Sequence, residues 1–352
     1  MLKPFSVKRS FLLEPTYRYT TDGLTPHRPS IREALCEWLD IVDFVRKPRR
    51  GLNALLFVAH WATLACLILF LVRYLTIRTG LFWLASVLFL CNGPHTLWYH
   101  RYCAHRAFKF KRPAFARIFL WLNPLYTPEE HYAIAHRQHH AFQERVGDPY
   151  GPHIGWLGSY VAIDSIQKLN VDIPPERYAK LQKSVQHIGF KMSTYEQFRR
   201  TGLVEHLGHY FARTLVAQTF WCALAYAIGG RPYVITWYGA TYMLWFLLRD
   251  FGWRGHRGKE KVPNWEFDAS SSATNQRFYG YLASEWHDNH HLYPNSANLA
   301  FLPSQFDITF QLVKLLSALG LVESYNDAKP KFDERFGRCA ASLASSAQPR
   351  AQ

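Results

Sequence analysis

The chain has 352 residues, of which 49% are hydrophobic and 16% aromatic, and it carries a formal net charge of +15. Its charged residues gather in blocks separated by long uncharged runs, a composition typical of a polytopic membrane protein with large soluble segments. The basic residues lie beside the apolar runs, so we attribute the positive charge to an anionic membrane surface and expect no nucleic-acid partner. Six cysteines without a CxxC pair argue against a zinc ribbon or a disulfide framework.

The N-terminal segment, residues 1–52, carries charges throughout and lacks an apolar core long enough for a signal peptide. Two apolar stretches follow, at about residues 54–72 and 81–99, and each is long enough to cross the roughly 30 Å of bilayer hydrocarbon. We expect Pro94 to kink the end of the second stretch.

A second apolar hairpin is predicted at about residues 211–228 and 233–250, joined by the turn GGRP. Four spans place both termini and the long segment 100–208 on one side of the membrane. That side holds most of the Lys and Arg residues, which makes it cytoplasmic by the positive-inside rule. The sequence therefore predicts an all-α integral membrane protein with four transmembrane helices in two hairpins and a cytosolic helical cap.

Two shorter apolar segments are also expected to be helical. Residues 115–127 are too few to span a bilayer, which indicates a re-entrant or interfacial helix. Residues 305–320 have apolar side chains at helical spacing and are expected to lie on the membrane or on the cap. The membrane domain is then residues 53–330, followed by a tail, residues 331–352, whose Ala-, Ser- and Gln-rich composition predicts disorder.

Two histidine pentads share one spacing: HRQHH at residues 136–140 and HDNHH at residues 287–291. Positions i, i+3 and i+4 fall on one face of an α-helix, so each pentad directs three imidazoles to one side. Neutral imidazole is the commonest side-chain metal ligand and suits iron, zinc and copper. The pentads therefore predict a metal site.

A third histidine group, HTLWYHRYCAH, contains two overlapping pairs, His95 with His100 and His100 with His105. Five residues on an α-helix turn through about 500°, which leaves the two side chains roughly 140° apart. A helix end or a kink is needed to bring either pair to one site. The spacing alone does not say which pair binds.

The segments HRYCAHRAFK, AIAHRQHHAFQERVGDPYGPH and EWHDNHHLYP resemble the three histidine boxes of the membrane fatty acyl desaturases. The resemblance covers about residues 80–325 and implies a di-iron centre in the cytosolic cap. It makes His100 and His105 ligands and leaves His95 as an extra ligand or a neighbour of the ligands. A ninth desaturase histidine follows the fourth span, where this chain has His256. The implied ligands are His100, His105, His136, His139, His140, His256, His287, His290 and His291.

The chain departs from the desaturase pattern at two places near these ligands. Gly252 stands where the desaturases have Asn four residues before the ninth histidine, and ASE at 283–285 replaces the frequent GEG. The resemblance implies double-bond formation in a long-chain fatty acid or acyl thioester. Hydroxylation, and oxidative decarboxylation of a free fatty acid to a terminal 1-alkene, stay open as alternatives.

Four carboxylates near the boxes are candidates to orient the ligands, because a ligating His usually donates its other N–H to a carboxylate or carbonyl. They are Asp148, Asp250, Glu285 and Asp288, and the alternative for each is a solvated surface charge. Four basic residues beside the boxes are candidates to meet an anionic headgroup or membrane phosphates: Arg101, Arg106, Lys109 and Arg137.

The implied chemistry consumes O₂ and needs electrons from outside the chain. No CxxCH, GxGxxG or ferredoxin-type cysteine run is present, so NAD(P)H electrons must arrive through a ferredoxin- or rubredoxin-and-reductase type of partner. We expect a bacterial inner membrane or an ER-type membrane, with membrane lipid around the protein. The alternative of a different class is a zinc-dependent membrane hydrolase, but an HExxH motif is missing.

Overall fold

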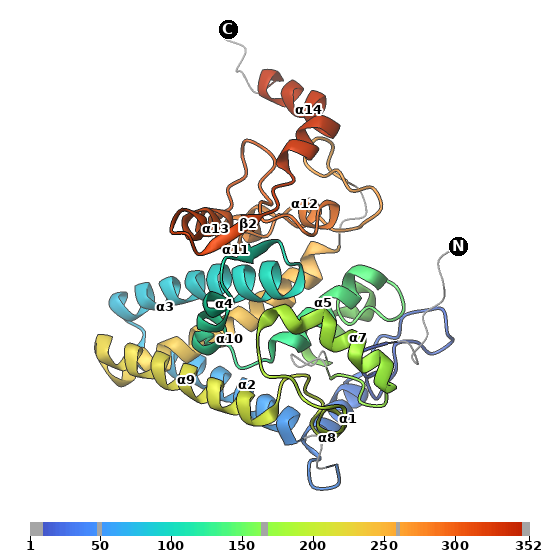
Figure 1. The fold of residues 1–352 in the computed structure, drawn as a ribbon, viewed down its shortest axis with the longest axis vertical. Helices are drawn as coiled ribbons and strands as arrows, with labels where there is room; N and C mark the ends of the chain where they lie inside the picture. Colours follow the sequence, from blue (N-terminus) through green and yellow to red (C-terminus); the bar gives the residue numbers. More distant parts are fainter. Residues whose placement is uncertain (1–9, 48–50, 163–167, 258–260, 347–352) are drawn as a thin grey trace.

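The computed structural model describes residues 10–47, 51–162, 168–257 and 261–346. In chain order the elements are α1 (Ile31–Val42), α2 (Gly51–Leu69), η3 (Phe70–Tyr74), α3 (Ile77–Leu90), η4 (Cys91–Ala104), β1 (Phe108–Phe110), α4 (Pro113–Leu122), α5 (Glu129–Phe142), η5 (Pro152–Ile154), α6 (Gly155–Leu157), η6 (Gly158–Ala162), α7 (Pro175–Val185), η7 (Gln186–Ile188), α8 (Tyr195–Thr201), α9 (Leu207–Gly229), α10 (Arg231–Gly255), α11 (Arg277–Ala283), α12 (His287–Leu292), α13 (Ile308–Ala318), β2 (Val322–Tyr325) and α14 (Lys329–Ser346). The long helices α2, α3, α9 and α10 lie together, and α10 packs against the other three (Figure 1).

Three helical stretches in the described part of the chain are long and apolar enough to cross a membrane: Gly51–Tyr74, Ile77–Ala104 and Leu207–Gly229. They coincide with the first three expected spans. The fourth expected span falls on α10, which is long but is not among the three, and Tyr, Trp, Thr and Gly are mixed with its aliphatic residues along the helix. Large apolar side chains such as Val72 and Leu215 are exposed on the outer helix faces, as expected for surfaces that meet lipid.

The second membrane helix changes its winding at residue 91. After α3 the chain continues without interruption as the π-helical segment η4, with Pro94 inside it. In a π-helix the hydrogen bonds join residues i and i+5, and the amide of His105 accordingly donates to the carbonyl of His100 at 3.1 Å. We expected Pro94 to kink the helix. Pro94, which lacks an N–H, lies instead just after the point where the hydrogen-bond pattern changes from α-helical to π-helical.

The shorter apolar helices form close to where the sequence predicted them. Helix α4 covers most of the expected segment 115–127 and packs against α9. Helix α13 forms within 305–320, packs against η4, and begins where Asp307 accepts the amide of Phe310 at 2.7 Å.

The all-α prediction was wrong in one detail, since β1 and β2 form a two-stranded antiparallel sheet. Strands of three and four residues are too short to show an alternating pattern in a sequence.

The tail also differs from its prediction, because residues 329–346 form helix α14 where disorder was expected. Phe332 is fully buried there, with its ring 4.9 Å from both Phe267 and Phe301. The disorder prediction rested on the average composition of the tail, to which a single Phe contributes little. The buried ring of Phe332 nevertheless holds the start of the helix against the rest of the protein. Residues 347–352, the end of the expected tail, lie outside the described part.

A buried ion-pair network joins α9 to the elements that carry histidine motifs. Arg213 of α9 is 1% exposed and contacts a carboxylate oxygen of Glu129 at 2.5 Å and of Glu205 at 2.6 Å. Glu129 opens α5 and also accepts the indole N–H of Trp98 in η4 at 3.2 Å. The guanidinium therefore ties α9 to two elements that carry histidine motifs.

Replacing Arg213 by Met should leave two buried carboxylates without their cation, a change that typically costs about 3–5 kcal/mol. We expect a clear fall in the unfolding temperature of the detergent-solubilised protein. Arg254→Met is the matched control, because Arg254 is exposed and pairs with Asp250 on the surface, where such pairs contribute little. Equal unfolding temperatures for the two variants would contradict the assignment.

Candidate metal centre

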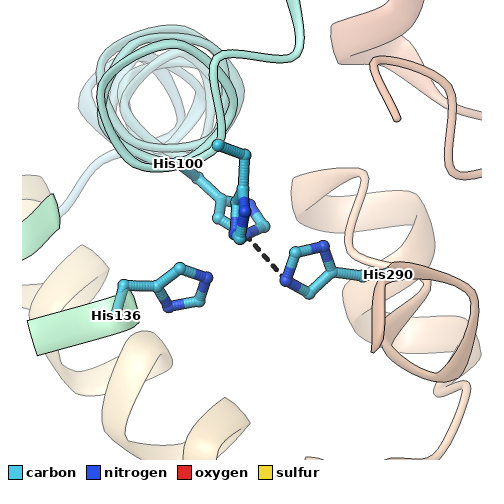
Figure 2. Close-up of side chains that lie close together, drawn as sticks. His100, His136 and His290 are labelled. Carbon is cyan, nitrogen blue, oxygen red and sulfur yellow. Dashed lines mark hydrogen bonds between the residues drawn. The ribbon is translucent and has the colours of Figure 1, made fainter. Parts of the chain in front are cut away.

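All nine histidines predicted as ligands come together. His100, His105, His136 and His290 form one group, and His139, His256, His287 and His291 form a second; in each, the ring nitrogens lie within 4.8 Å of one another. His140 shares a further group with His290 and His291. Figure 2 shows the rings of His100, His136 and His290 turning toward a common point from three different elements.

Local winding explains how each element presents its rings. The π-helical turn of η4 brings residues five apart near each other, and the His100 and His105 ring centroids are 4.9 Å apart. The kink required by an α-helical reading is therefore unnecessary. The histidines of each pentad are divided between the two groups. The expectation that a pentad directs its three rings to one side therefore holds, but the rings reach two adjacent sites and not a single one.

The inward nitrogens of several rings lie within hydrogen-bond distance of one another. His256 Nδ1 lies 3.0 Å from a Glu144 oxygen, and because a carboxylate only accepts, we place the ring proton on Nδ1. The Nε2 lone pair of His256 then lies 2.7 Å from Nε2 of His287.

A similar arrangement occurs in the other group. His100 Nδ1 donates to Glu285 at 2.6 Å, while its Nε2 lies 3.2 Å from Nε2 of His290. The buried Nε2 atoms of His105, His139 and His291 have no hydrogen-bond partner in the described residues. Converging lone pairs of this kind fit a bound cation, so the residues present suit a metal at each group.

Burial also keeps these rings in the form that binds metals. It lowers the pKa of His136, His290 and His291 well below the usual 6.5, and nearby histidines lower it further. The imidazoles are therefore neutral at pH 7, with a lone pair available.

The outer nitrogens of the rings are held by a shell of polar partners. Asp148 accepts from Nδ1 of His139 at 2.9 Å, and Tyr150 and Gln143 contact Nδ1 of His136 and His291 at 2.7 and 3.0 Å. Glu144, Gln143 and Tyr150 were missed by the sequence analysis. The available signal was their place directly after the first pentad, in the stretch QERVGDPY.

Two of the four candidate carboxylates thus contact histidines, Asp148 and Glu285, and two lie elsewhere. Asp250 accepts the Tyr160 hydroxyl at 2.5 Å and bonds to Tyr279 and Arg254, which joins α10 to η6 and α11.

Asp288 also has partners outside the centre. Although it lies between two histidines in sequence, it is fully buried against Lys261 and the amide of Phe267, at 2.6 and 2.5 Å. His95 belongs to neither group of four, but its ring is parallel to His100 at 6.4 Å.

A cavity of about 140 Å³ lies against both groups. Its walls include His95, His100, Tyr132, His136, His139, Tyr150, Trp245, Leu248, Phe251, Trp253, His256, His287 and His290. Aromatic and aliphatic side chains beside a metal centre suit an alkyl chain, because they provide a dry surface and few hydrogen bonds.

Sequence comparisons relate the chain to a known family. The family model described as "Fatty acid desaturase" matches residues 78–298, which is more than half of the chain. The chain belongs to the fatty acid desaturase family. The matched range begins in α3 and ends after α12, so it contains all nine histidines.

Curated desaturases are similar over most of the chain. An acyl-CoA 5-desaturase, AL21, from Anemone leveillei is 28% identical over 253 residues, covering 70% of this chain and 72% of its own length. An sn-2 palmitoyl-lipid 9-desaturase from Nostoc sp. is 26% identical over 259 residues, covering 71% and 81%. An sn-1 stearoyl-lipid 9-desaturase from Synechocystis sp. is 24% identical over 254 residues, covering 68% and 70%.

Asp148→Asn should weaken metal retention, because the substitution removes the carboxylate that orients His139. Loss of such a partner typically costs about 10- to 100-fold in metal affinity. We would titrate the metal-loaded protein with a chelator and follow the metal released. Asp250→Asn is the matched control, since Asp250 contacts no histidine in the described residues. Equal retention by the two variants would contradict the role given to Asp148.

Proposed function

We propose that this member of the desaturase family is an O₂-dependent di-iron enzyme that introduces a double bond into a long-chain acyl group. The observation that carries the proposal is the pair of four-histidine groups bordering one apolar cavity. Family membership supports the reaction class, and the names of the relatives, acyl-CoA and acyl-lipid desaturases, support a fatty acyl substrate.

The metals are proposed to be two iron ions. Desaturation oxidises the substrate, whereas zinc has no redox chemistry, so a redox-active metal that imidazole binds well is required. His100, His105, His136 and His290 would hold one ion, His139, His256, His287 and His291 the other, with His140 beside both. Bound there, iron supplies the activation of O₂ and the removal of hydrogen from an unactivated methylene.

The chain itself positions the ligand rings and the alkyl chain, and it keeps water out of the cavity. Glu285, Asp148 and Glu144 fix three ligand rings by accepting their Nδ1 protons, which directs Nε2 inward. The apolar cavity wall holds the alkyl chain beside the two groups. Glu285 belongs to the ASE segment that departs from the desaturase pattern, so this departure still supplies a partner to a ligand.

The electron balance requires an external donor. Forming one double bond takes two hydrogens from the substrate, and reducing O₂ to two waters needs two further electrons and two protons. We propose that NAD(P)H supplies the electrons through a ferredoxin- or rubredoxin-type carrier and its reductase.

The proposed topology has four spans, with α10 as the fourth. It is supported by the length of α10 and by its packing against α2, α3 and α9. Both termini and the histidine groups would then face the cytoplasm, in agreement with the distribution of Lys and Arg.

The direct test is expression of the chain in cells with a suitable reductase, followed by gas chromatography and mass spectrometry of lipids and headspace. We expect new unsaturated acyl chains that fall below detection in the His139→Ala, His140→Ala double variant. A volatile 1-alkene one carbon shorter than its acid would favour decarboxylation, and a hydroxylated chain would favour hydroxylation. Either of these products, formed in place of unsaturated acyl chains, would contradict desaturation.

A further inference from the structure

Helix α1, the element that precedes the membrane helix α2, carries a row of aliphatic side chains that the described part of the chain leaves open. Ile31, Leu35 and Leu39, here called the open stripe, are 69%, 50% and 68% exposed. Their spacing of four residues places them on one face of the helix. Single exposed apolar residues need no partner, whereas several on one face usually mark a contact surface.

The other faces of α1 have different surroundings. Ala34 and Ile41 are buried, and α1 packs against α2 and η6. Arg32, Cys36 and Asp40 each follow a residue of the open stripe by one position, so they form a polar stripe about 100° further round the helix. Around its axis, α1 therefore has a face against the protein, then the open stripe, then the polar stripe.

Aromatic contacts fix the level of α1 along the membrane helix. The ring centroid of Trp38 lies 5.7 Å from that of Phe57 and 5.2 Å from that of Trp61. Both partners lie in the first half of Gly51–Tyr74, a stretch long and apolar enough to cross a membrane. Helix α1 therefore lies alongside the first turns of this stretch, at the level where the chain enters the lipid.

The surroundings of the open stripe suit a membrane surface. On α2, Leu55 and Val58 lie within a turn of the rings that Trp38 contacts and are 51% and 59% exposed, as expected for a surface that meets lipid. Arg32 and Arg46 are exposed and form none of the ion pairs found in the described part of the chain. Arginine beside apolar surface can keep its stem in the apolar layer while its charged head reaches lipid phosphates.

We propose that α1 lies in the membrane surface, with the open stripe among lipid acyl chains and Arg32 at the phospholipid phosphates. The partner of this surface is thus the lipid bilayer and not another protein. An amphipathic helix of this kind typically sinks its apolar face about 5–10 Å into the boundary between headgroups and acyl chains. The inference goes beyond the proposed function, because it holds for any reaction at the metal centre.

This position of α1 also relates the cavity to the lipid. The indole N–H of Trp38 donates to the carbonyl of Val161 at 3.0 Å, and Val161 belongs to η6, whose Ser159 lines the cavity. The membrane-bound helix would then hold this part of the cavity wall close to the lipid surface. That an acyl substrate enters from there rests on the proposed function.

The test is nitroxide labelling of the full chain in vesicles of phosphatidylcholine and phosphatidylglycerol. Labels are attached to Leu35→Cys, to Leu39→Cys or to the native Cys36 of the polar stripe, in chains whose other cysteines are replaced by Ala. Collisions with O₂, which concentrates in lipid, are compared with collisions with a nickel chelate, which stays in water. We expect the ratio of O₂ to nickel-chelate accessibility to be several-fold higher at residues 35 and 39 than at Cys36 or at Lys180→Cys, an exposed site on α7.

Three results would overturn the inference. Equal ratios at all four positions would place the open stripe in water. A higher ratio at Cys36 than at residues 35 and 39 would turn the polar stripe toward the lipid. Shielding of residues 35 and 39 from both reagents would mean that protein covers the stripe, and dipolar broadening between nitroxides would identify that protein as a second copy of the chain.

The labelling result and the reaction can fail separately. Labels at residues 35 and 39 that lie in lipid, in a chain that forms no unsaturated product, would support the position of α1 and count against desaturation. Desaturation by a chain whose labels at these residues lie in water would refute the position of α1 and leave the reaction standing.

Discussion

Buried imidazole nitrogens that point at one another are the constraint on which the rest of this structure depends. A neutral imidazole carries one proton, and where a carboxylate accepts that proton the other nitrogen presents a lone pair. Nδ1 of His139 donates to Asp148 at 2.9 Å, so Nε2 of this ring presents a buried lone pair that meets no donor in the described residues. A bound cation would accept such lone pairs, so the arrangement is understandable as a preformed metal centre.

Holding such a centre requires support from elements far apart in sequence. Arg101, next to His100, is 1% exposed and bonds to Asp307 at 2.9 Å and to the carbonyl of Ser284 at 3.0 Å. Arg213 supplies a similar link through Glu129 at the start of α5. Buried ion pairs of this kind add little net stability. They disfavour other packings of these elements, because a packing that breaks either pair leaves a buried charge without its partner.

Much of the site could be predicted from the sequence because metal ligands leave patterns of residue type and spacing. The pentads, the third histidine group and three apolar spans were all readable. The π-helical winding of η4 could not be predicted, because a long π-helical segment is rare. The five-residue spacing of His100 and His105 was therefore interpreted as α-helical. The resemblance to the desaturases, rather than the geometry, selected His100 and His105.

Residues whose role depends on tertiary contacts were harder to predict. Asp148 and Asp250 both lie near histidine motifs in sequence, yet only Asp148 contacts a histidine. Arg101 was a candidate for an anionic headgroup and is instead fully buried against Asp307. Proximity in sequence therefore identified the region of the centre but not the orientation of the charged side chains around it.

The most direct test of the central claim is the metal content of the purified full chain, measured for all first-row transition metals by inductively coupled plasma mass spectrometry. Protein produced with both iron and zinc available should contain two iron atoms per chain and little zinc. A chain that retains zinc, or that binds no metal while remaining folded, would contradict the assignment of the two four-histidine groups to a di-iron centre.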